Sequence, residues 1–113
     1  MIDLKNRNCV ACVKGGPALT AQRAAELLRE LPGWEFDGET QTIGRTLRFK
    51  NFYETMAFVN AVAWIAHRED HHPDLEVSYN CCVVRYRTHA VDGLSENDFI
   101  CAAKVDALLA AHV

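Results

Sequence analysis

The sequence predicts an α+β fold: a single domain with elements in the order α-β-β-α-β-β-α and a four-stranded antiparallel sheet with helices packed on one face. Three observations predict it. The chain has 113 residues, half of them hydrophobic, which suits one domain with a real core. Strand-like segments come in two adjacent pairs, and strands joined by short turns pair in antiparallel fashion. Helical patterns precede, separate and follow these pairs, an order typical of helices layered on a sheet.

The first helix is predicted over residues 21–31. Thr20 is a favourable N-cap, and Pro32-Gly33 ends the pattern. The apolar residues that share one helical face are Ala24, Leu27, Leu28 and Leu31. Ahead of this helix, residues 1–19 show little periodicity, so we expect a flexible arm there and a domain that spans 20–113.

Residues 34–36 and 42–50 are predicted to form the first hairpin, because Asp37-Gly38 between them is a turn signal. The apolar residues on one face of the second strand are Ile43, Leu47 and Phe49. Arg45 interrupts this face with a charge.

Residues 51–69 form the longest helical pattern. Its apolar residues fall on three stripes: Phe52, Met56, Val59 and Ala63; Tyr53, Ala57 and Trp64; Phe58, Val62 and Ile65. A helix that is apolar around most of its circumference must be covered on more than one side, and a small sheet covers only one. We therefore expect this helix to pack against another subunit. A second helix of the same chain is the alternative cover.

The second hairpin begins after Pro73, which ends the long helix. Its strands show period-two alternation. The apolar positions are Leu75, Val77 and Tyr79 in one strand and Cys82, Val84 and Tyr86 in the other. His89 falls on the more polar face, at the carboxyl end of the fourth strand.

The last helix is predicted from Ser95, as its N-cap, to about Ala111. Asp98 stands three residues after Ser95 and completes a variant of the capping box. Leu94 and Phe99 have the spacing of a hydrophobic staple.

Composition excludes several classes of protein. The net charge is −3 and no block of Lys or Arg occurs, which disfavours direct binding of nucleic acid. No apolar stretch reaches membrane-span length and the amino end lacks the apolar core of a secretory signal, so we expect a cytoplasmic protein without membrane contact. Five cysteines are an odd number, which favours reduced thiols over a disulfide framework.

Three of the five histidines lie in two short segments, Glu69-Asp70-His71-His72-Pro73-Asp74 and Arg87-Thr88-His89. Imidazole is the side chain that gives and takes protons near neutral pH, with an ordinary pKa of about 6.5. The first segment lies at a helix exit and the second on a strand, so the rings are able to meet around one ligand. Asp70 is placed to accept an imidazole N–H and fix its tautomer. This set predicts acid–base chemistry.

Other chemistries remain open. His67 and His71 are spaced as two zinc ligands on one helix face, although the acid between them is misplaced for a zinc-protease motif. Cys9-Val10-Ala11-Cys12 has the C-x-x-C spacing of a redox or zinc site, without a second pair. A nucleophilic cysteine is a further alternative, with candidates Cys81, Cys82 and Cys101.

The chain resembles the pterin-4a-carbinolamine dehydratase family. The resemblance covers roughly residues 17 to 112 and is carried by Asp70-His71-His72-Pro73, Tyr79-Asn80, Thr88-His89 and Gly93-Leu94-Ser95-Glu96-Asn97-Asp98. It implies a lyase that removes water from 4a-hydroxytetrahydrobiopterin to give quinonoid dihydropterin, without a metal or an organic cofactor. It also implies a place in tetrahydrobiopterin recycling for aromatic amino acid hydroxylation, and a homodimer or homotetramer.

The resemblance also implies the site residues. His71 and His89 would be the acid–base pair, and His72, the third member of the catalytic set, would chiefly bind substrate. Asp98 would support His89, although a capping acid is expected there without any catalysis. The other residues expected at the pterin are Asp70, Pro73, Thr88, Ala90, Val91 and His67, with no metal ligand among them.

Two positions depart from the family pattern. His67 stands where many relatives have Glu, so the contact with the guanidine-like edge of the pterin is expected to weaken, to be shared with Glu69, or to be lost. Leu75 replaces a frequent aromatic residue. The second class of function left open is an oligomeric protein-interaction module, comparable to a transcriptional coactivator, with little catalytic role.

Overall fold

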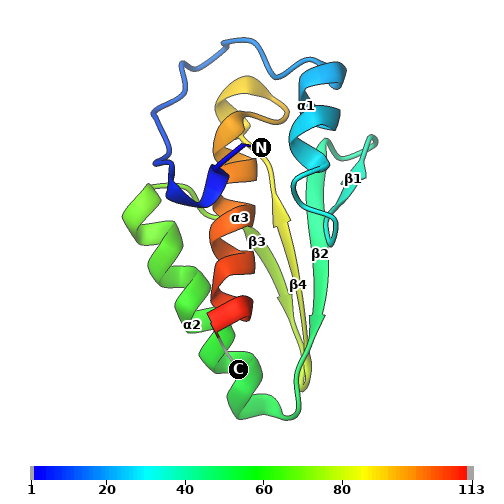
Figure 1. Ribbon diagram of the computed structural model, residues 1–113, viewed down its shortest axis with the longest axis vertical. Helices are drawn as coiled ribbons and strands as arrows, with labels where there is room; N and C mark the ends of the chain where they lie inside the picture. The colour runs from blue at the N-terminus through cyan, green and yellow to red at the C-terminus, as the bar shows by residue number, and fades with distance from the viewer. Residues whose placement is uncertain (1, 112–113) are drawn as a thin grey trace.

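The computed structural model describes residues 2–111, and its architecture confirms the predicted fold class (Figure 1). Four strands form one antiparallel sheet in the order β1-β2-β4-β3, and the helices lie on one side of it. The helices and strands are α1 (Ala21–Leu28), β1 (Glu35–Asp37), β2 (Thr42–Arg48), α2 (Phe52–Glu69), β3 (Asp74–Val77), β4 (Cys81–Tyr86) and α3 (Glu96–Ala111), with short 3-10 helices η1 (Leu4–Asn6) and η2 (His89–Val91).

Side-chain caps start the first two helices. The hydroxyl of Thr20 accepts a hydrogen bond from the Arg23 N–H, as predicted, and the Asn51 side chain accepts one from the Glu54 N–H. Helix α1 ends at Leu28, three residues before the predicted end, because tighter turns follow it on the approach to Pro32. Strand β3 likewise ends at Val77, because the turn into β4 takes up the residues that follow.

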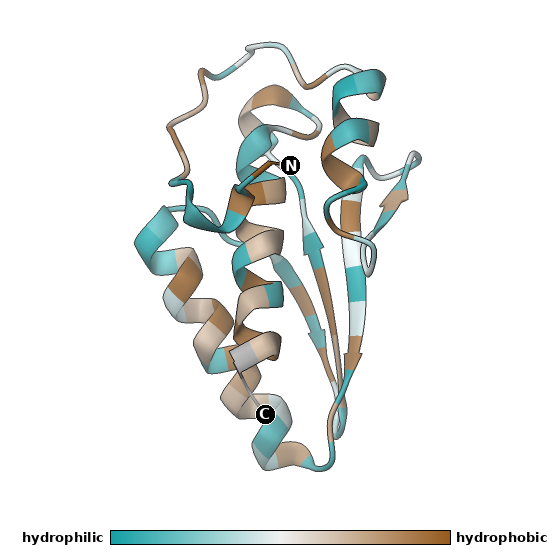
Figure 2. Cartoon of the chain, in the orientation of Figure 1, coloured by the Kyte–Doolittle hydropathy of each residue, from teal (hydrophilic) through white to brown (hydrophobic). Residues whose placement is uncertain are grey.

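The core lies between the sheet and the helices. Cys82, Val84 and Tyr86 of β4 are fully buried and alternate with partly exposed neighbours, which confirms the predicted alternation. Hydrophobic residues recur along the helices as well as along the strands (Figure 2). Arg45 of β2 shares the inner face with the buried Ile43 and Leu47. Its guanidinium lies 2.6 Å from a carboxylate oxygen of Asp106 on α3, and that oxygen also accepts the indole N–H of Trp34.

Helix α2 is covered on one side by α3 and β4. Its buried residues are Thr55, Phe58 and Val62. The aromatic side chains of Phe52, Tyr53 and Trp64 remain 51%, 82% and 61% exposed. The second helix of the same chain therefore covers only part of the apolar circumference, and packing against another subunit stays a prediction. Between residues 2 and 111, no helix is both long and apolar enough to cross a membrane.

The amino-terminal arm packs along the domain in the structure (Figure 1). Leu4 is buried in the core and η1 lies against α3. Farther along, the Leu19 N–H donates to the Leu94 carbonyl. The flexibility expected for residues 1–19 stays a prediction, and any motion of the described part of the arm would have to break these contacts.

Candidate active site

The chain reverses direction where α2 ends, and this turn sets the position of the first histidine pair. Asp70 is the C-cap, with a left-handed backbone at φ 52°, and the His71 N–H still donates to the Ala66 carbonyl. The side chain of His71 is therefore held close to α3, while His72, one residue later, is exposed. The two adjacent rings occupy different environments, as expected at a helix exit.

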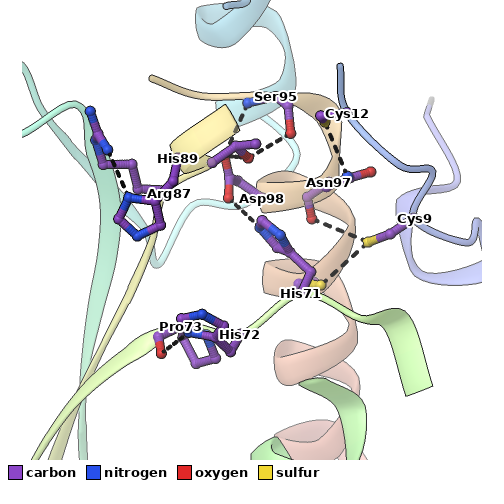
Figure 3. Close-up of polar contacts among 12 residues, drawn as sticks. Cys9, Cys12, His71, His72, Pro73, Arg87, His89, Ser95, Asn97 and Asp98 are labelled. Carbon is purple, nitrogen blue, oxygen red and sulfur yellow. Dashed lines mark hydrogen bonds and ion pairs between the residues drawn. The ribbon is translucent and has the colours of Figure 1, made fainter. Parts of the chain in front are cut away.

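His71 is paired with a buried carboxylate (Figure 3). Its Nε2 lies 2.6 Å from Oδ1 of Asp98, whose side chain is fully buried. The side chain of His71 is 12% exposed. Because a carboxylate accepts and does not donate, Nε2 carries the hydrogen and Nδ1 is left as the proton acceptor of a neutral ring.

The second oxygen of Asp98 is also occupied. Oδ2 accepts hydrogen bonds from the Thr88 hydroxyl at 2.8 Å and from the Ser95 backbone N–H at 3.0 Å. The Ser95 hydroxyl bonds to Thr88 rather than to the helix. Asp98 therefore caps α3 and holds an imidazole at once. That imidazole belongs to His71, not to His89 as the resemblance implied.

The ring of His71 rests on Tyr86 at the end of β4. The two ring centres are 5.9 Å apart and the planes differ by 11°. Tyr86 is fully buried, and no other described residue bonds to its hydroxyl. Burial raises the pKa of Tyr86, so the phenol stays neutral at physiological pH. His71 thus has an apolar floor and a carboxylate behind it.

His89 has a different setting. Strand β4 ends at Tyr86, so His89 is not on the strand but begins η2. Its exposed ring accepts at Nδ1 from the guanidinium of Arg87, at 3.2 Å, and Arg87 also pairs with Asp92. Arginine only donates, so Nδ1 is the acceptor and Nε2 carries the hydrogen in the neutral ring.

The three histidines nevertheless meet at one pocket of about 330 Å³. The expected site residues that line it are Asp70, His71, His72, Thr88, His89 and Ala90. Convergence of imidazoles from two separate segments is the arrangement expected from the sequence. It places two rings of the same tautomer around one space, with Nδ1 of His71 and Nε2–H of His89 free of the partners described above.

The other four expected residues do not line this pocket. Asp98 lies behind His71, and the carbonyl of Pro73 faces Nδ1 of His72. Val91 lies within η2. His67 is exposed on α2, with its ring 5.8 Å from that of Trp64.

Five lining residues were not predicted from the sequence: Val10, Ala11, Cys12, Arg87 and Asn97. The first three belong to the arm, where no periodicity indicated a contact with the domain. Asn97 stands in the first turn of a helix, where its type is ordinary. Among residues 2–111, no group of three or more His, Cys, Asp or Glu side chains is arranged to hold a metal ion.

The fold and pocket define a small single-domain α+β protein with a histidine–carboxylate pair at a pocket lined by three histidines. Comparison with known proteins gives the family. The chain belongs to the pterin 4 alpha carbinolamine dehydratase family, whose sequence model matches residues 17–108.

Similar proteins agree with this family. A provisionally named pterin-4-alpha-carbinolamine dehydratase of Nitrosospira multiformis is 57% identical over 106 residues, which cover 94% of this chain and 92% of the relative. A transcriptional coactivator/pterin dehydratase from Brucella melitensis has a crystal structure that matches with a TM-score of 0.77 at 34% identity, over 80% of this chain and 97% of that one. A third similar protein is a pterin dehydratase-like RuBisCO assembly factor of the alpha-carboxysome, which shares the fold. It is 22% identical and matches with a TM-score of 0.59 over 67% of this chain and 88% of its own.

Proposed function

We propose that this chain is a hydro-lyase that converts 4a-hydroxytetrahydrobiopterin, the pterin-4a-carbinolamine, into quinonoid dihydropterin and water. The observation that carries the proposal is the convergence of His71, His72 and His89 on one pocket in a member of this family. The reaction loses hydroxide from C4a and a proton from N5. It therefore needs one group that accepts a proton and one that donates.

His71 is suited to accept the N5 proton. Asp98 holds the Nε2–H and stabilises the imidazolium that forms when Nδ1 takes up the proton, as the carboxylate does in a serine-protease triad. Asp98 does not itself need to be protonated. Because its other oxygen is bonded to Thr88 and Ser95, the carboxylate stays in place during the transfer.

His89 is suited to donate to the departing oxygen. The Arg87 guanidinium occupies Nδ1, so the neutral ring presents Nε2–H as a hydrogen-bond donor to the departing hydroxide, which leaves as water after it takes a proton from solvent. The N5 lone pair forms the C4a=N5 bond as the C4a–O bond breaks. His71 gains one proton and the departing hydroxide takes one from solvent, and release of the His71 proton to solvent closes the cycle with His89 neutral throughout.

The other lining residues that the sequence predicted bind the ring. The exposed carboxylate of Asp70 is suited to the guanidine-like edge of a pterin, which presents two N–H donors side by side. His72, Thr88 and Ala90 supply further contacts, with Pro73 next to His72 and Val91 next to Ala90. His67 lies outside this pocket, so we propose that Asp70 supplies the acidic contact that a Glu at position 67 makes in many relatives.

The proposed role in metabolism follows from the product. Quinonoid dihydropterin is what a reductase needs to regenerate the tetrahydropterin used by an aromatic amino acid hydroxylase. The functional partner is therefore such a hydroxylase, and the ligand is its hydroxylated pterin. No metal or organic cofactor is required by the steps above.

The test is an absorbance assay of quinonoid dihydropterin formed from freshly made carbinolamine, with and without a chelator. We expect catalysis in both conditions, and a fall of about 10²- to 10⁴-fold in kcat for the double variant His71→Ala/His89→Ala. The matched control is Thr46→Ala/Arg48→Ala on β2, away from the pocket. Wild-type turnover in the histidine variant would refute the assignment, and inhibition by chelator would refute metal-free chemistry.

We also propose that the chain self-associates through the exposed apolar side of α2, formed by Phe52, Tyr53 and Trp64. Exposed aromatic groups of this number on one helix are typical of an interface. A dimer or tetramer is expected in sedimentation at micromolar concentration. A species of only 12.7 kDa would refute this proposal.

The same helix favours a second candidate function, that of a protein-interaction module. A structural relative carries the name transcriptional coactivator/pterin dehydratase. The two candidates are separated by the isolated protein: dehydration activity supports the lyase, and its complete absence supports the interaction module.

A further inference from the structure

The amino-terminal arm forms one wall of the pocket that holds the three histidines. Val10, Ala11 and Cys12 line it together with His71 and His89. This part of the chain lies outside residues 17–108, which the family model matches. Nothing in the steps proposed above uses the arm, so its position calls for a separate account.

Asn97 holds the arm at this wall by two backbone hydrogen bonds. Its Oδ1 accepts from the Val10 N–H at 3.0 Å, and its Nδ2 donates to the Val10 carbonyl at 2.6 Å. Asn97 is only 6% exposed and is the residue before Asp98. The clamp on the arm is therefore built on the same helical turn that supplies the carboxylate for His71.

Two further anchors lie on either side of this clamp. The Cys9 N–H donates to the Glu69 carboxylate at 2.7 Å, and the side chain of Glu69 is 7% exposed. On the other side, the Gly15 N–H donates to the Ala90 carbonyl at 2.7 Å, next to His89. The arm is thus tied to the helix end that precedes His71 and to η2, which begins with His89.

We infer that residues 10–12 are a substrate-binding wall of the pterin pocket and that Asn97 and Glu69 are positioning residues that keep this wall in place. The inference rests on the proposed function and goes beyond it by assigning part of the substrate affinity to the arm. Val10 uses both its backbone groups on Asn97, whereas among described residues no backbone bond engages Ala11. The peptide groups of Ala11 are therefore free to bond a heterocyclic edge.

The physical consequence concerns affinity rather than chemistry. If the anchors are removed, the pterin must order the arm when it binds, and this loss of chain freedom weakens binding. The proton-transfer groups keep their own hydrogen bonds. Loss of the clamp is expected to raise KM about 5- to 30-fold, equivalent to two hydrogen bonds, with kcat within about twofold.

The experiment measures kcat and KM for carbinolamine dehydration and, separately, the Kd for 7,8-dihydropterin, which has no C4a hydroxyl to lose. The variants are Asn97→Ala and Glu69→Ala in the full chain. Glu69 does not line the pocket, so a matching effect at this position excludes loss of a direct contact as the cause. The control is Asn60→Ala, an exposed asparagine on α2, which should leave all three values unchanged.

The outcomes separate this inference from the proposed function. A rise in KM and Kd for both variants with near-normal kcat supports the wall. Three results would overturn the inference. These are an unchanged Kd and KM in both variants, a rise in Kd and KM for Asn97→Ala but not for Glu69→Ala, and a loss that is confined to kcat. If the wild-type protein binds dihydropterin through the arm but does not dehydrate the carbinolamine, only the proposed lyase activity is refuted. If the wild-type protein does not bind dihydropterin, the substrate-binding role of residues 10–12 is refuted as well.

Discussion

His71 and His89 line the same pocket in opposite electrostatic settings. His71 is largely buried, rests on an aromatic ring and donates to a carboxylate. His89 is exposed and accepts from a guanidinium. The partner of each ring leaves a different nitrogen free, so Nδ1 of His71 is available as a proton acceptor and Nε2–H of His89 as a hydrogen-bond donor. Partner choice, not residue type, separates the two roles.

The largest loss of kcat is expected from Asp98→Asn. This substitution removes the negative charge behind His71 and preserves the volume of the side chain. The amide can donate to Nε2, which would reverse the tautomer and leave Nδ1 protonated. A fall in kcat of about 10²- to 10⁴-fold is expected in the dehydration assay. Asp74→Asn, at an exposed aspartate of β3, is the control. Near-normal kcat in Asp98→Asn would show that the buried carboxylate only caps α3.

A smaller effect is expected from Arg87→Met, which frees Nδ1 of His89. The ring can then adopt either tautomer, so part of the population presents no N–H to the departing oxygen. The expected loss in kcat is about 3- to 10-fold, roughly one hydrogen bond. Arg85→Met on β4, two residues before Arg87, removes an arginine whose partner is Glu76 and should have no effect on kcat. A loss as large as that of Asp98→Asn would make the two histidine settings equivalent.

The free energy of unfolding is also expected to depend on pH in the alkaline range, because two buried groups near His71 and α3 titrate there in the unfolded chain. Burial raises the pKa of Tyr86, and a hydrogen bond with Cys9, together with burial, raises the pKa of Cys101. Both groups stay protonated in the folded protein when the unfolded chain begins to lose these protons, at about pH 8.5 for Cys and about 10 for Tyr.

Their contribution to stability is therefore complete below those values and declines as the pH rises, by about 1.4 kcal/mol per pH unit for each group. Urea unfolding between pH 7 and 11 measures this slope. Tyr86→Phe and Cys101→Ala should each make it shallower. A slope that neither variant changes would contradict the assignment.

The smallest effect is expected from Tyr86→Phe at neutral pH. The hydroxyl is buried and no described residue bonds to it, whereas the ring carries the contact with His71. The free energy of unfolding should stay the same or rise by up to about 1 kcal/mol, and kcat should not change. Destabilisation above about 1.5 kcal/mol would reveal a partner for the hydroxyl.

Local patterns predicted most of the fold because each is a short-range physical preference. Alternation placed Cys82, Val84 and Tyr86 on the inner face, and Thr20 predicted the start of α1. The end of α1 was misplaced because a continuing apolar pattern did not reveal the turn before Pro32. How α2 is covered depends on residues outside this helix, which no pattern within one helix determines.

The candidate site was predictable where residue type carries the chemistry. His71, His72, His89 and Asp98 stood out by type and spacing, and the structure brings these four together, whereas His67 lies outside the pocket. The partner of Asp98 was not predictable, because His71 lies 27 residues away in sequence. The contact of the arm with the pocket was not predicted, because Asn97 binds the backbone of Val10. A hydrogen bond to backbone does not depend on the residue type of the partner.

Arg45 on the inner face also bears on strand alignment. Sliding β2 by one position along β4 would carry this cation to the open face of the sheet, away from Asp106, and would put Gly44 or Thr46 over the core in its place. The ion pair between Arg45 and Asp106 therefore favours the observed register of the central strands β2 and β4. A swapped or shifted pairing of these strands between two copies would lose the ion pair and would therefore be disfavoured during folding.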